Sequence, residues 1–130
     1  MSQDIGDAKA FIADLVARSR AAQKQIEHYS QEQVDALIRA MVWSVARPGM
    51  AEEIAQFTID ETELGNYDGK FLKIQRKTRA TLLDIIHDKS VGIIEEYPER
   101  NIRVLAKPLG VIGALAPSTN PEATPVIKGI

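Results

Sequence analysis

Apolar side chains recur every three or four positions through the first 89 residues of the chain. From about residue 4 to 27 this spacing predicts an amphipathic helix. Ser30 opens the sequence Ser-Gln-Glu-Gln, which fits a capping box, and a regular apolar stripe behind it predicts a second helix. Pro48 and Gly49 follow that stripe, so we expect the second helix to end there.

Two further helices are expected before the pattern changes. One runs from about residue 50 to 64, and Gly65 and Asn66 behind it suit the left-handed backbone with which helices often end. The other runs from about residue 67 to 88. Trp43, near the stripe of the second helix, is expected in the core. The core-facing residues of the third and fourth helices are expected to be Ile54, Phe57, Phe71, Ile74, Leu82, Ile85 and Ile86.

After Lys89 the pattern becomes strand-like. Residues 91–94 and 102–105 are short apolar or alternating runs, and residues 97–101 between them suit a chain reversal, which together predict an antiparallel hairpin. Residues 109–116 are almost wholly apolar. Because a short unbroken apolar run bounded by prolines is typical of a parallel sheet, we expect a strand buried on both faces.

Residues 117–121, Pro-Ser-Thr-Asn-Pro, interrupt this apolar run. Pro121 suits the first turn of a following helix, and Asn120 suits its N-cap. A strand buried on both faces needs neighbouring strands, and a strand–loop–helix unit normally leads to another parallel strand. Only nine residues follow Pro121 here, so we expect the chain to be a truncated part of a longer fold.

Composition and charge argue against several classes of partner. The net charge of −2, the isoelectric point near 5.7 and the aromatic content of 5% disfavour a nucleic acid or an anionic membrane held by charge. No apolar run reaches the roughly 20 residues that a membrane span needs. The N-terminus lacks the pattern of a signal peptide, so we expect a cytoplasmic protein.

The 130 residues contain no cysteine and only two histidines, His28 and His87. A disulfide, a thiolate metal site and a cysteine nucleophile are therefore absent from them, and the histidines have no neighbours at ligand spacing. We expect no metal site. Gly110 and Gly113 lie inside the predicted strand and not in a glycine-rich strand-to-helix turn, so they are no dinucleotide fingerprint.

Two stretches resemble one known family. Residues 106–117 are similar to the strand, PLGVVGAI-P, that opens the cofactor-binding domain of aldehyde dehydrogenases. Residues 117–121 then resemble the P-[ST]-T-N-P of the CoA-acylating branch, where ordinary members read P-W-N-F-P. Residues 60–73 resemble the segment E-E-T-G-M-G-x-x-x-D-K-x-x-K of the same branch. The helices and the hairpin match in order, so the resemblance covers nearly the whole chain.

The resemblance implies an α/β parent fold. The chain would supply an N-terminal helical region, a β-hairpin and the first strand–loop–helix of a Rossmann-like cofactor domain. Residues 1–89 would form the helical part of the cofactor-binding domain, and residues 90–107 the hairpin of the oligomerisation and bridging region of a homo-oligomer. Residues 108–130 would be the start of the Rossmann-like domain, truncated at its end.

The reaction that the resemblance implies converts an aldehyde, CoA and NAD or NADP to an acyl-CoA and the reduced cofactor. In the family a cysteine thiolate attacks the aldehyde, hydride passes to the nicotinamide, and CoA accepts the acyl group. We expect sulfoacetaldehyde or succinate semialdehyde as substrate. Because these 130 residues have no cysteine, we expect no activity from them alone.

The loop after the predicted strand carries the candidate site. By match to the family, Ala116, Pro117, Ser118 and Thr119 would line the cofactor, because ligands of open α/β sheets bind beyond the strands' carboxyl ends. A rigid turn made by the prolines is the alternative. The ordinary family's oxyanion-binding asparagine is the third residue of its loop. Here Thr119 is third and Asn120 fourth, so either Thr119 or Asn120 would be catalytic.

Other readings of the sequence stay open. A basic run on the predicted fourth helix either attracts CoA or cofactor phosphates or is a solvated face; its members are Lys70, Lys73, Arg76, Lys77 and Arg79. Lys128 is either a proton-relay residue by match to the family or a surface lysine. A non-enzymatic helical assembly or interaction domain is the main alternative, because an unpaired hairpin edge can pair with another chain. A chance match in an unrelated helical protein is the third hypothesis.

Overall fold

A computed structural model describes residues 5–130. The chain divides into two compact units. The first comprises residues 1–30 and 90–113, and the second comprises residues 31–89 and 114–130. The start that the sequence predicted for the first helix, at residue 4, lies outside the described residues.

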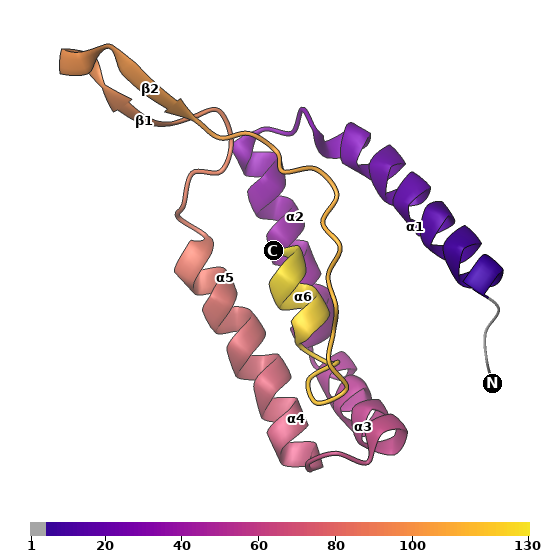
Figure 1. Ribbon diagram of the computed structural model, residues 1–130. Coiled ribbons are helices and arrows are strands. Elements are labelled where there is room, and N and C mark those ends of the chain that lie inside the picture. The colour runs from indigo at the N-terminus through magenta and orange to yellow at the C-terminus, as the bar shows by residue number, and fades with distance from the viewer. Residues whose placement is uncertain (1–4) are drawn as a thin grey trace. The chain divides into compact units, whose positions relative to one another are not determined.

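The first unit contains one long helix and a hairpin (Figure 1). Helix α1 spans Ile5–Ile26. Among residues 5–130, none of the helices combines the length and the apolar composition that a transmembrane span requires. Strands β1 (Ile93–Tyr97) and β2 (Ile102–Leu105) pair antiparallel, as the sequence predicted, although β1 begins two residues later than expected. A 3₁₀ turn, η2 (Pro98–Arg100), and Asn101 in the left-handed region reverse the chain.

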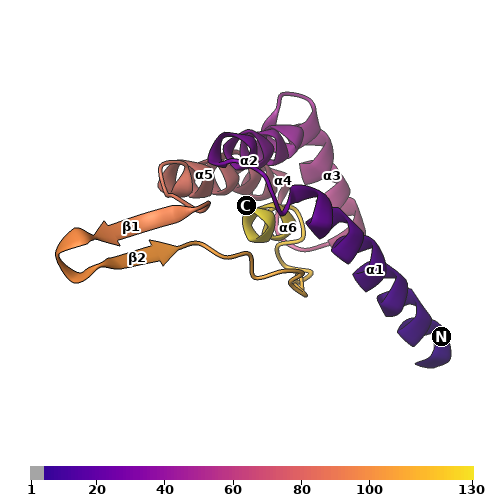
Figure 2. The same cartoon turned by 90° about the horizontal axis from the view of Figure 1, so that it is seen from above.

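The second unit is helical (Figures 1 and 2). Its elements are α2 (Gln31–Ala46), α3 (Met50–Thr62), α4 (Tyr67–Lys73), the π-helical turn η1 (Ile74–Thr78), α5 (Arg79–Ile85) and α6 (Thr124–Gly129). The expected second, third and fourth helices are therefore confirmed, with a π-helical turn inside the fourth. Helix α6 packs against α2 and η1. A Cβ at Gly129 would lie 2.5 Å from Met41 Cε, which shows how closely α6 approaches α2.

The core of the second unit lies where α3 meets η1. Ala51, Ala55 and Ile74 are completely buried, with partly buried Val45, Ile54 and Phe71 packed around them. The small alanine side chains let the helices approach closely. Two residues that the sequence placed in the core, Trp43 and Phe57, are exposed. Both lie beside the buried stripe of their helix, which is narrower than the apolar pattern indicated.

Residues 109–116 differ from the prediction of a buried strand. They form neither a strand nor a helix, and the side chains of Leu109 and Leu115 are 89% and 90% exposed. The sheet of the described residues has two strands, β1 and β2, and neither pairs with this segment. No strand of the described residues pairs with this segment and gives it a place in a sheet, so the apolar run stays exposed.

The helix predicted from Pro121 onward begins later than expected. Helix α6 starts at Thr124, and Ala123 occupies its N-cap position. The expectation that Asn120 caps this helix is therefore wrong. Asn120 lies instead in a turn, where its backbone N–H donates to the Pro117 carbonyl oxygen at 3.1 Å.

Candidate functional site

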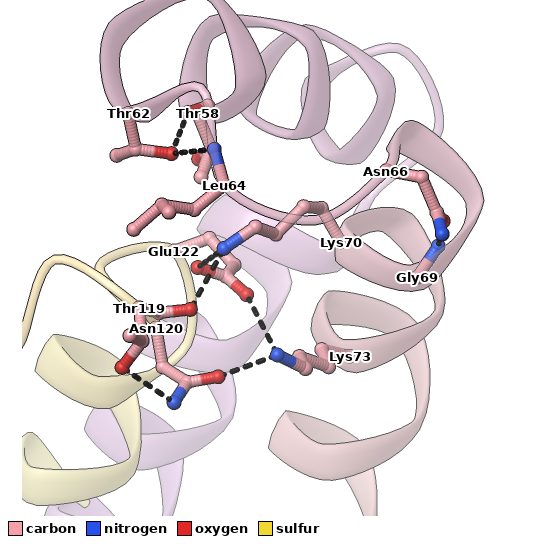
Figure 3. A network of polar contacts seen from close by, with 10 residues as sticks. All are labelled: Thr58, Thr62, Leu64, Asn66, Gly69, Lys70, Lys73, Thr119, Asn120 and Glu122. Atoms are coloured by element: carbon pink, nitrogen blue, oxygen red, sulfur yellow. Dashed lines mark hydrogen bonds and ion pairs between the residues drawn. The ribbon is translucent and has the colours of Figure 1, made fainter.

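The start of α4 is fixed by local hydrogen bonds. Asn66 is its N-cap, and its side-chain oxygen accepts from the Gly69 backbone N–H at 2.8 Å. The Thr62 hydroxyl donates to the Thr58 carbonyl oxygen at 2.6 Å and accepts from the Leu64 N–H at 3.2 Å. These contacts hold the turn between α3 and α4 (Figure 3). They set the position of the two lysines that follow on α4.

Lys70 points from α4 into the protein. Its side chain is only 3% exposed, its Nζ donates to the Thr119 carbonyl oxygen at 2.7 Å, and it lies 3.6 Å from Glu122 Oε2 (Figure 3). The expectation that the basic run is a solvated face is therefore wrong for Lys70.

Lys73, one turn further along α4, reaches the same loop. Its Nζ donates to the Asn120 side-chain oxygen at 2.6 Å and lies 4.0 Å from Glu122 Oε1. The Asn120 side-chain nitrogen donates to the Thr119 hydroxyl at 3.3 Å. Thr119 and Asn120, the two candidates for the oxyanion role, therefore lie side by side, each in contact with one of the two lysines (Figure 3).

Glu122 completes the cluster. Its carboxylate is fully buried, and among the described residues neither oxygen accepts a hydrogen bond. A buried carboxylate is costly unless a counter-charge lies nearby, and here two ammonium groups lie within 4.0 Å. Two lysines and one glutamate leave an excess of one positive charge at the loop.

The other candidate residues lie on the exposed side of the loop. Ala116, Pro117 and Ser118 are exposed and follow the apolar segment directly. A surface hollow of about 330 Å³ adjoins the loop; it is lined by Leu64, Gly65, Asn66, Gly69, Lys70, Lys73 and Thr119. The cofactor-lining role of Ala116, Pro117, Ser118 and Thr119 stays a prediction.

The rest of the basic run does not reach the loop. Arg79 Nη2 donates to the Ala46 carbonyl oxygen at 3.0 Å, so it satisfies the end of α2. Arg76 and Lys77 are exposed. Among residues 5–130 no group of histidine, cysteine, aspartate and glutamate side chains gathers in a way that could hold a metal ion.

The loop was predicted from the sequence, but Glu122 was not among the predicted site residues. The available signal was the three-residue spacing of Lys70 and Lys73, which puts both lysines on one face of a helix. The carbonyl oxygen that Lys70 contacts belongs to Thr119, 49 positions further along the chain. No local sequence pattern links positions so far apart.

No family model matches the chain, but several curated relatives do. It is 40% identical over 119 residues to a sulfoacetaldehyde dehydrogenase of Acholeplasma sp, a match covering 92% of this chain and 25% of the relative. It is 44% identical over 119 residues to the succinate-semialdehyde dehydrogenase (acetylating) of Clostridium kluyveri, covering 92% and 26%. The sulfoacetaldehyde dehydrogenase (acylating) of Cupriavidus necator is 38% identical over 117 residues, covering 90% and 24%.

The chain thus spans about a quarter of the length of these curated relatives. All three are dehydrogenases of aldehydes, and two of their names state that they transfer an acyl group. The resemblance indicated by the two sequence motifs is confirmed. Over about nine tenths of its length, the chain is similar to curated acylating aldehyde dehydrogenases.

Proposed function

We propose that this chain forms the N-terminal part of an NAD(P)-dependent, CoA-acylating aldehyde dehydrogenase. In that enzyme residues 1–89 are the helical part of the cofactor-binding domain, residues 90–107 are an oligomerisation hairpin, and residues 108–130 begin the Rossmann-like domain. The observation that carries the proposal is the loop 117–121, held on α4 by two lysines in a chain whose relatives are acylating dehydrogenases. Nothing specific favours a non-enzymatic assembly domain.

Asn120 is the better candidate for binding the oxyanion that develops on the aldehyde oxygen. Its amide nitrogen carries two N–H groups, and the described contacts use one of them, toward the Thr119 hydroxyl. The second N–H is available to a ligand oxygen. Thr119 has a single side-chain donor, its O–H, and we propose that this hydroxyl, which accepts from Asn120, faces the cofactor. We therefore assign the donor role to Asn120 and a supporting role to Thr119.

Ala116, Pro117, Ser118 and Thr119 form the proposed cofactor side of the loop. All four are exposed, and the hydroxyls of Ser118 and Thr119 suit the hydroxyl groups of a cofactor ribose. When bound, NAD or NADP accepts hydride and CoA accepts the acyl group. The relatives act on sulfoacetaldehyde and succinate semialdehyde by name, so we propose a short aldehyde with an anionic group at its far end as substrate.

The proposal can be tested by grafting. The aligned segment of the Clostridium kluyveri enzyme is replaced by this chain, and CoA-dependent cofactor reduction with succinate semialdehyde is measured with NAD and NADP. We expect activity from the grafted enzyme, and none from the 130-residue chain alone because it contains no cysteine. Sequencing beyond codon 130 is the second test, in which a continuing frame with a later cysteine is expected.

The role of Asn120 is tested in the same grafted enzyme. Removing an oxyanion donor costs about 10²- to 10³-fold in kcat, so Asn120→Ala is expected to lower kcat by that factor. Lys77→Met is the control, because Lys77 is an exposed lysine in the adjoining turn η1. A folded Asn120→Ala enzyme with unchanged kcat would contradict the assignment, and a folded but inactive graft would contradict the function itself.

A further inference from the structure

We propose that Lys73 is a positioning residue, which fixes the direction in which the Asn120 side-chain amide faces. Lys70 and Glu122 hold the loop on which Asn120 lies. The catalytic role of this arrangement rests on the proposed function. The contacts themselves form within this chain and do not depend on that function.

The chemistry of the two side chains determines which end of the Asn120 amide faces Lys73. The two ends of an asparagine amide have nearly the same shape, but the oxygen accepts hydrogen bonds and the nitrogen donates them. A lysine ammonium group has three donors and no acceptor. The 2.6 Å contact between Lys73 Nζ and the Asn120 amide is therefore favourable only with the amide oxygen toward the lysine. The opposite orientation would place two donors against each other.

The loop itself is anchored on both sides of Asn120. Before it, the Thr119 carbonyl oxygen accepts from Lys70 at 2.7 Å. After it, the buried carboxylate of Glu122 lies 3.6 Å from Lys70 and 4.0 Å from Lys73. Moving this loop away from α4 would leave a buried lysine and a buried glutamate without counter-charges, which is costly. Lys73 therefore acts on an amide whose backbone is already fixed (Figure 3).

With the oxygen held by Lys73, the amide nitrogen must face the other way. It lies 3.3 Å from the Thr119 hydroxyl, which leaves one N–H for a ligand. The positive charge on Lys73 also polarises the amide, because hydrogen bonds in a chain strengthen one another. Lys73 in this way makes Asn120 a preoriented and stronger donor without touching the substrate.

Nuclear magnetic resonance of the side-chain amide tests this inference in the 130-residue chain. In the unsubstituted chain the Asn120 amide protons are expected to show Overhauser contacts to the Thr119 side chain and not to the Lys73 ε-methylene. Contacts to the Lys73 ε-methylene instead would overturn the proposal without any variant.

Substitution provides the matched comparison. Lys73→Met is expected to shift the Asn120 side-chain amide signals and to weaken their contacts to Thr119, while Lys73→Arg, which keeps a cationic donor, retains them. Lys77→Met removes the same charge from an exposed position and is expected to leave the Asn120 signals in place. Unmoved signals in a folded Lys73→Met chain would overturn the proposal. None of these readouts needs catalysis, so their failure is distinguishable from an inactive grafted enzyme.

Discussion

At Lys70 and Glu122, two opposite charges lie where solvent hardly reaches, with 3% and 0% of their side chains exposed. Each charge loses its hydration on folding, and the attraction between them compensates part of that cost. Such a pair adds little net stability compared with apolar residues, but it penalises any structure in which the partners separate. The pair therefore serves to specify the loop conformation more than to stabilise the chain.

Glu122→Gln is expected to lower the free energy of unfolding by about 3–5 kcal/mol, because it leaves the Lys70 ammonium buried without a counter-charge. Urea unfolding followed by circular dichroism measures this loss. Glu61→Gln, at an exposed position of α3, is the control and is expected to change stability by less than about 0.5 kcal/mol. Equal effects of the two substitutions would show that the charge pair is not formed.

The structure changes the titration of the Tyr97 phenol. It donates a hydrogen bond to Glu95 Oε2 at 2.5 Å, and this bond together with the negative charge raises the Tyr97 pKa above its ordinary value of about 10. The raised pKa favours the neutral phenol in the folded chain. The corresponding stability is complete below the unfolded pKa and is lost as pH rises through the folded pKa.

Glu95→Gln is expected to lower the pKa of Tyr97 toward its ordinary value, because it removes the carboxylate that opposes phenolate formation. The ultraviolet absorbance of phenolate, taken as a difference from Tyr97→Phe, isolates this tyrosine from the other two. Glu96→Gln is the matched control, since Glu96 pairs with Arg103 at 2.8 Å on the same hairpin. A Tyr97 pKa unchanged by Glu95→Gln would rule out the hydrogen bond.

At the scale of the elements, the end of α3 carries strained backbone. Glu63 is the C-cap and adopts φ of 53°, in the left-handed region that residues with a Cβ avoid. Glu63→Gly is expected to raise the free energy of unfolding by about 0.5–1 kcal/mol. The same change at Glu61, inside the helix, is expected to lower it by about as much. Two changes of equal sign in urea unfolding would contradict this account.

The junction of α3 with η1 carries the packing of the second unit. Ile74→Ala is expected to lower the free energy of unfolding by about 2–5 kcal/mol, because Ile74 is completely buried against Ala51 and Ala55. Leu83→Ala, in the adjoining α5, is the control and is expected to cost less than about 0.5 kcal/mol because Leu83 is 70% exposed. Thermal unfolding measures the stability of both variants. Similar losses of stability would show that the core does not lie at Ile74.

The helices and the hairpin could be predicted because their signals are local. Helical spacing and the punctuation at Pro48, Gly49 and residues 97–101 need no knowledge of distant parts of the chain. Burial is not local, so the pattern misplaced Trp43 and Phe57. In the site, the loop was recognised from its sequence, whereas the buried role of Lys70 depends on Glu122, 52 positions away by their numbers (122 − 70). Charge alone could not distinguish Lys70 from exposed Lys77.

At the scale of the whole molecule, residues 109–116 carry the strongest conflict between sequence and structure. Their apolar composition is typical of a strand inside a sheet, but the described residues offer them no partner strand. The chain matches about a quarter of the length of its relatives. We therefore propose that the apolar composition of this segment suits pairing with strands that the rest of a complete enzyme supplies. The segment would then contribute to stability only in that context.

Replacing both Leu109 and Leu115 by serine is expected to have different effects in the 130-residue chain and in the grafted enzyme. In the 130-residue chain both side chains are almost fully exposed, so the double substitution is expected to change the free energy of unfolding by less than about 0.5 kcal/mol per site. It should also reduce self-association, measured by sedimentation, because exposed apolar patches promote it. In the grafted enzyme the same change buries polar groups in a sheet and is expected to cost several kcal/mol, at roughly 2 kcal/mol or more per site. Equal effects in the two proteins would contradict the proposal that these residues form a sheet strand in the complete enzyme.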